Sequence, residues 1–180
     1  MLGGMESDNP SGADNQQERP GLAEWIAGFT DGEGCFSISV VRNEGCRLGW
    51  QVQHEFAITQ SSSSLAALES IRSHMGCGRI VVSERADNHR EPLARYSVKR
   101  RKDLTQVVIP FFEAHPLMTA KRNDFVLFKR AMEIIALERH LEVEGLVEIA
   151  RLTESMNRKQ RSRFLESSEA IRRPSRSAAR

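Results

Sequence analysis

Two carboxylates alternate with two glycines at Asp31-Gly32-Glu33-Gly34, directly after an apolar stretch. The apolar residues recur at helical spacing, which predicts a helix with one buried face: Leu22, Trp25, Ile26 and Phe29. Acids at a helix C-terminus oppose the helix dipole, and a locally unfavourable arrangement is typical of a functional site. Carboxylate oxygens suit a hard divalent cation such as Mg²⁺. The pattern therefore favours a metal site at the helix tip over its alternative, a solvated acidic turn.

The rest of the chain predicts the elements that position this tip. Alternating residues predict strands at 35–43, 48–60, 79–85 and 93–101, in two pairs separated by a short helix at 65–75. Helical spacing then predicts three helices, with Pro110 kinking or ending the first and the others at 121–140 and 142–158. The order α-ββ-α-ββ-α-α-α indicates an α+β fold. Helices cover one face of a four-stranded antiparallel sheet and leave the other face polar.

The outward face of these strands carries Ser, Gln, Thr, Arg and Lys side chains. Such groups read base edges in the DNA major groove, which admits a β-ribbon, and Arg also holds phosphates. The alternative is a plain polar surface. The candidate DNA-binding residues are Ser37, Ser39, Val41, Asn43, Gln51, Gln53, Glu55, Thr59, Arg79, Val81, Ser83, Arg85, Arg95, Ser97 and Lys99.

The stretch Ile26–Gly34 resembles the signature of the LAGLIDADG homing endonucleases, and the resemblance extends from about residue 21 to about residue 160. Further similar segments are Phe56–Gln60, Gly76–Ile80, Ile109–Phe112, His115–Leu117, Asp124-Phe125 and Met156-Asn157. The resemblance implies an αββαββα unit whose sheet forms a saddle over the DNA major groove. It also implies a site-specific endonuclease that hydrolyses both strands of double-stranded DNA with a divalent metal.

The resemblance also assigns roles at the helix tip. It implies that Glu33 binds Mg²⁺, for which Mn²⁺ can substitute, with help from the Gly32 backbone carbonyl. Asp31 is expected chiefly to support the tip and the subunit contact, with metal ligation as its second role. Gln60 matches a strand-end glutamine that positions water. The basic residue of the site is Lys121, with the adjacent Arg122 as alternative; a basic residue that some relatives carry just after the glutamine is missing here.

The sequence holds a single copy of the motif, whereas cutting both strands requires two metal-binding tips. We therefore expect a homodimer with the motif helices side by side, acting on a near-palindromic DNA site. The small side chains could instead pack within one subunit. The residues expected at the dimer interface are Leu22, Ala23, Ile26, Ala27, Gly28, Thr30 and Asp31.

Composition bounds the remaining expectations. The formal net charge is +2, so the local basic stretches matter more than the average. We expect a disordered leader at 1–19, the endonuclease domain at 20–160 and a basic, disordered tail at 161–180. Three cysteines without paired spacing argue against a zinc site, and no apolar run has the length of a membrane span.

These features predict an intracellular protein, cytoplasmic in a prokaryote and organellar in a eukaryote, with no membrane partner. A protein of the same fold that binds without cutting is the alternative, either a DNA-binding regulator or an RNA-splicing maturase with intron RNA as its partner. The intact acidic tip favours the nuclease over this alternative, and the intact core and polar face argue against a decayed relic of a mobile element.

Overall fold

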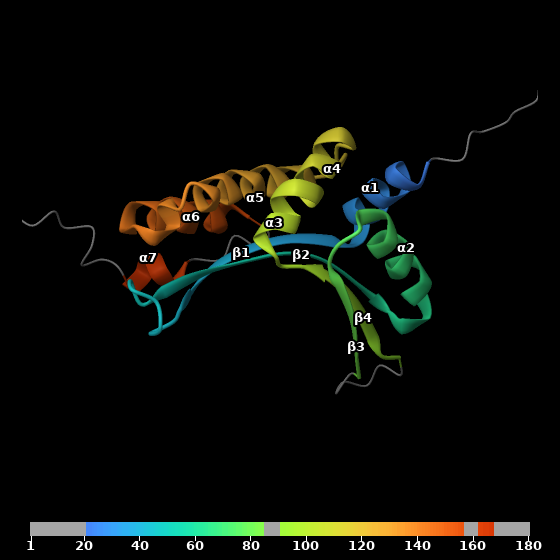
Figure 1. The fold of residues 1–180 in the computed structure, drawn as a ribbon, viewed down its shortest axis with the longest axis horizontal. Helices are drawn as coiled ribbons and strands as arrows, with labels where there is room; N and C mark the ends of the chain where they lie inside the picture. Colours follow the sequence, from blue (N-terminus) through green and yellow to red (C-terminus); the bar gives the residue numbers. More distant parts are fainter. Residues whose placement is uncertain (1–20, 85–90, 157–161, 168–180) are drawn as a thin grey trace, which may run out of the picture.

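The computed structural model describes residues 21–84, 91–156 and 162–167. Its centre is a four-stranded antiparallel sheet in the order β1-β2-β4-β3. The strands are β1 (Gly34–Arg42), β2 (Trp50–Ser61), β3 (Arg79–Ser83) and β4 (Leu93–Val98). Figure 1 shows the sheet as an arch with the helices on its convex side, and none of the described helices covers its concave side. This confirms the predicted α+β fold.

The helices follow the predicted order. They are α1 (Leu22–Glu33), α2 (Leu65–Met75), α3 (Arg101–Asp103), α4 (Ile109–Ala114), α5 (Lys121–Ala136), α6 (Val143–Ser155) and α7 (Arg163–Ser167), with short 3-10 turns at Ser62–Ser64 and Arg139–Leu141. None of them in the described part of the chain has the length and apolar character needed to cross a membrane.

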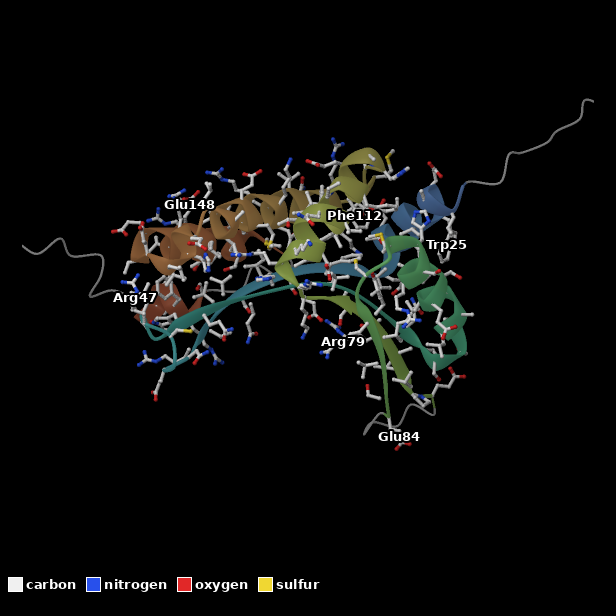
Figure 2. The ribbon with its side chains drawn as sticks, viewed as in Figure 1. Trp25, Arg47, Arg79, Glu84, Phe112 and Glu148 are labelled. Atoms are coloured by element: carbon white, nitrogen blue, oxygen red, sulfur yellow. The ribbon has the colours of Figure 1, made fainter. Side chains whose placement is uncertain are left out.

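An aromatic cluster joins the sheet to the helices. Phe36 of β1 is fully buried, stacks on Phe56 of β2 at 5.0 Å between ring centroids and meets the Phe112 ring edge-on at 5.3 Å. Figure 2 places Phe112 above the sheet, among the helices. Full burial of each such ring contributes about 1.5–3 kcal/mol. Phe36 follows the acidic tip by three residues, so the cluster anchors the start of β1 directly after the tip.

The helical segment around Pro110 continues instead of ending there. Between α3 and α4, residues Leu104–Val108 form a π-helical stretch, in which the Ile109 N–H donates to the Leu104 carbonyl. Proline has no N–H and crowds the preceding turn, and the wider π turn accommodates both effects. Pro110 was expected either to kink the helix or to end it, and the structure shows a distorted helix that continues.

The predicted boundary between the domain and its tail is wrong. Helix α7 packs against α6 and β1, and its Phe164 and Leu165 are 1% and 4% exposed. Phe164 lies edge-on to Trp50 at 5.1 Å. Two adjacent apolar residues in an Arg- and Ser-rich stretch give no periodic pattern, so the sequence did not indicate this helix. The expected leader at 1–19, Arg85 and the tail beyond 167 lie outside the described residues.

Candidate active site and nucleic-acid interface

Helix α1 turns into strand β1 without a loop. Its last residue is Glu33, and Gly34 is both its C-cap and the first residue of the strand. A Cβ atom on Gly34 would lie 2.5 Å from Thr30 Cγ2 and 2.9 Å from the Thr30 carbonyl oxygen, so no larger residue fits without a backbone shift. The close packing of Gly34 on Thr30 therefore sets the position of Glu33 at the edge of the sheet.

The Glu33 side chain is exposed and makes no hydrogen bond or ion pair with the described residues. The neighbouring Gly32 is also exposed. A carboxylate that no donor of the described residues satisfies remains available for an external cation. The tip thus presents the carboxylate that the sequence predicted as a metal ligand.

Asp31 is held in a different way. Its Oδ2 accepts a hydrogen bond from the Met118 N–H at 2.6 Å, and its Oδ1 accepts from the Thr119 N–H at 3.1 Å and the Thr119 hydroxyl at 2.7 Å. Burial alone raises the pKa of Asp31, but the Met118 and Thr119 hydrogen bonds outweigh it and lower the pKa below 3.8. Since both carboxylate oxygens are engaged, Asp31 ties α1 to the loop before α5. The geometry argues against the metal-ligand role and for the supporting one.

We expect Asp31→Asn to destabilise the fold by about 1 kcal/mol at pH 7, because the amide places a donor where the loop needs an acceptor. The lowered pKa of Asp31 means that its contribution is present above its ordinary pKa and disappears as the pH falls through the folded value. Urea unfolding of both proteins should show a difference at pH 7 that shrinks in acid. Asp103→Asn, which removes a 3.9 Å pairing with the exposed Arg100, is the control, and an equal loss there would contradict the assignment.

Lys121 and Gln60 lie beside the same tip. The Lys121 ammonium donates to the Thr30 carbonyl at 2.9 Å, at the negative end of α1. Arg122 instead lines a groove between α4 and α5, so the structure favours Lys121 as the basic residue. Strand β2 pairs Ile58 with Gly34 and continues past it, which brings the half-buried Gln60 alongside the helix end. The alternation of β2 places Gln60 on the helix-covered side.

The donors at the tip fit a magnesium ion as part of a site. Among the residues that the structure describes, no group of three or more His, Cys, Asp or Glu side chains could hold a metal. Mg²⁺ is commonly held by one or two carboxylates, with waters and substrate phosphates completing its octahedron. The exposed Glu33 carboxylate and Gly32 carbonyl match that pattern, so a single tip supplies some of the ligands and other molecules must supply the rest.

The concave face gathers the candidate DNA-binding residues into rows across the strands. One row is Thr59, Arg95 and Val81, and the next is Cys35, Ala57, Ser97 and Arg79. Figure 2 shows Arg79 projecting into the concavity. The register therefore adds the exposed Cys35, which the sequence did not single out because it lies where the strand begins. The face is polar, open and basic along β3 and β4.

Ser97 departs from the prediction. Its side chain is on the concave face, but the residue is only 5% exposed, and the neighbouring Ala57 is 2% exposed. Both are short side chains in a central row between longer ones. The alternation along the strand correctly predicts the face on which they lie, but it does not predict that their neighbours cover them. Ser97 is not available for a base contact in this structure.

The predicted dimer interface is partly wrong. Ile26, Ala27 and Thr30 are 0%, 7% and 0% exposed because they pack inside their own subunit. The uncovered face of α1 carries the exposed Leu22, Gly28 and Gly32. Trp25 and Phe29, whose rings stack at 5.1 Å, are half-buried beside it and pack partly against the core. The i, i+4 spacing of the two glycines was the signal that could have shown this face.

Known proteins of the same kind match the chain over most of its length. The LAGLIDADG endonuclease family profile matches residues 26–132. A probable intron-encoded endonuclease of Neurospora crassa is 36% identical over 135 residues, which are 74% of this chain and 24% of that protein. The chain spans only 24–28% of the length of the first curated relatives that it matches.

Solved structures agree with this match. The crystal structure of the homing endonuclease I-TnaI is 36% identical with a TM-score of 0.71, covering 83% of this chain and 97% of that one. The I-SmaMI homing endonuclease bound to cleaved DNA is 28% identical with a TM-score of 0.73, covering 90% of this chain and 52% of that one. A saddle-shaped sheet with an acidic helix tip at its edge is thus a homing-endonuclease fold. The chain belongs to the LAGLIDADG endonuclease family.

Proposed function

We propose that the chain is a site-specific homing endonuclease that hydrolyses phosphodiester bonds in both strands of double-stranded DNA. The observation that carries the proposal is the exposed Glu33 carboxylate, which has no partner among the described residues and directly precedes the edge strand β1. Family membership and the DNA-bound state of I-SmaMI support DNA as the substrate. Relatives are named intron-encoded endonucleases, which supports an intracellular protein that acts in intron homing.

The residues at the tip divide the work of hydrolysis. Glu33 and the Gly32 carbonyl would hold Mg²⁺ or Mn²⁺, which when bound would supply a nucleophilic water and charge stabilisation for the leaving oxygen. The Lys121 ammonium, anchored on the Thr30 carbonyl, lies at the tip and offsets negative charge that gathers at the scissile phosphate. Gln60 orients the attacking water with its amide. Asp31 holds the loop that leads into Lys121, and so fixes the position of Lys121 relative to the α1 tip that carries Glu33.

Two further observations support a homodimer. A Cβ atom on Gly28 or Gly32 would meet nothing within 4 Å, so packing inside the subunit does not require glycine at either position. Glycine inside a helix costs about 1 kcal/mol relative to alanine. A second helix approaching this face closely would explain both glycines. The chain also matches 97% of I-TnaI but 52% of I-SmaMI, as expected if it corresponds to half of the longer protein.

A cleavage selection tests the proposal. The purified chain is incubated with a library of duplexes randomised over the expected footprint, in Mg²⁺ and, separately, in EDTA, and cut ends are sequenced. We expect a single near-palindromic site to be enriched among products cut in both strands in Mg²⁺, and no products in EDTA. Sequence-specific binding without cutting in Mg²⁺ or Mn²⁺ would refute the nuclease and favour a non-cleaving DNA-binding protein, and specific binding of intron RNA alone would favour the maturase.

A further inference from the structure

An acidic side chain occupies the middle of the concave face. Glu55 Oε2 lies 2.9 Å from Arg95 Nη2, and Glu55 Oε1 lies 3.6 Å from Lys99 Nζ. The Glu55 side chain is 17% exposed, whereas those of Arg95 and Lys99 are 45% and 57% exposed. One carboxylate on β2 therefore holds two cations from β4 and the residue that follows it.

This arrangement is unfavourable for simple attraction to DNA. Each free Lys or Arg that neutralises a phosphate releases counterions and strengthens binding to any sequence, whereas Glu55 withdraws two such groups and adds a negative charge. A face evolved only to attract the backbone gains nothing from Glu55. The carboxylate does, however, fix the direction of a guanidinium, and direction matters for reading bases.

The Arg95 guanidinium is held from two sides. Its Nη1 donates to the Thr59 hydroxyl at 3.0 Å, and its Nη2 donates to Glu55. Of the five N–H groups of a guanidinium, two are used in this way and the others remain for a ligand. In the same row, Val81 flanks Arg95 with an apolar side chain that offers no competing acceptor. Arg95 thus has few orientations open to it, and its free donors lie on the concave face.

We propose that Glu55 is a specificity-determining residue: with Thr59 it orients Arg95 to read one guanine in the major groove, and it keeps Arg95 and Lys99 from binding phosphates of any sequence. This inference rests on the proposed DNA-binding function and adds a division of labour within it. Arginine binds the O6 and N7 atoms of guanine bidentately, which fits a guanidinium fixed at one edge. Glu55 itself makes no base contact in this arrangement.

Selection of bound duplexes from a randomised library, in Ca²⁺ to prevent cutting, tests the proposal on the full chain. The wild-type protein should select a guanine at one position in each half-site. Glu55→Gln should weaken that preference on the order of tenfold, the value of one bidentate contact. It should also tighten binding to a random-sequence duplex and steepen the salt dependence of log K by about one unit or more, as Arg95 and Lys99 gain phosphates.

Two comparisons separate orientation from net charge. Glu44→Gln changes the charge equally at the exposed β1–β2 turn and should keep the guanine preference. The double variant Glu55→Gln with Lys99→Gln restores the net charge and should still lose the guanine preference. Arg95→Lys keeps the charge but cannot bind guanine bidentately, so it should lose the preference as well. If the wild-type protein selects a sequence and Glu55→Gln selects the same one equally well, the inference is overturned. If the wild-type protein selects nothing, the proposed function fails first.

Discussion

Replacing Glu33 by Gln is expected to lower the rate of DNA cleavage by about 10³-fold or more while leaving DNA affinity nearly unchanged. The amide has the same shape but lacks the charge that holds the divalent cation. Because Glu33 is exposed and has no partner among the described residues, its replacement removes no contact that stabilises the fold. The loss should therefore appear in the chemical step and not in the free energy of unfolding.

The measurement compares single-turnover cleavage in Mg²⁺ with binding in Ca²⁺, on the site that the cleavage selection defines. Glu69→Gln, at an exposed position of α2, makes the same chemical change away from the tip and should cut at the wild-type rate. A Glu33→Gln protein that still cut both strands would show that the metal is held elsewhere. A protein that neither bound nor cut would show that Glu33 serves recognition.

Gly28→Leu should abolish dimer formation, and with it the cutting of both strands. The new side chain starts from an exposed position of α1 where an added Cβ atom meets nothing within 4 Å, so we expect the monomer to fold normally. Two helices that approach through glycines have no room for a leucine at their contact.

Sedimentation analysis at working concentration checks this expectation, together with a plasmid assay that separates nicked from linear DNA. Ala66→Leu, at an exposed position on α2, adds the same bulk to a helix surface outside the proposed contact and should leave both readouts unchanged. A wild-type mass near 20.3 kDa with and without DNA would refute the dimer. So would a Gly28→Leu protein that remains dimeric and linearises the plasmid.

The fold could be predicted because its periodicities are strong. Phe36, Ile38 and Val40 alternate cleanly in β1, and the apolar rows of α5 recur at helical spacing, so element types and their order followed directly. The separation of Asp31 from Glu33 was also predicted, and the hydrogen bonds from Met118 and Thr119 supply its physical basis. Those donors lie far along the chain, so no local pattern could name them.

The residues wrongly assigned to the dimer interface share a cause: residue type alone does not determine which face of a helix turns toward the sheet. Ile26, Ala27 and Thr30 were expected between subunits because they are small or apolar, yet they face the sheet. Gly28 and Gly32 are exposed on the other side, and Trp25 and Phe29 are half-buried between the two. Which face of α1 meets the sheet depends on how the chain enters β1 at Gly34, and that is a property of the packed domain. The burial of Phe164 is likewise a tertiary effect.

Because no loop separates α1 from β1, the spacing between Glu33 and the side chains of the sheet is fixed. Glu33 and the first side chain on the concave face are separated by a single glycine that cannot be enlarged. If the chain cuts DNA as proposed, the covalent chain therefore sets the distance from the cut bond to the nearest base that it reads. Exchanging side chains along β1 and β2 can therefore change which sequence is recognised without moving the scissile position within it. The DNA sequence that is recognised could then be redesigned without changing the position at which the strands are cut.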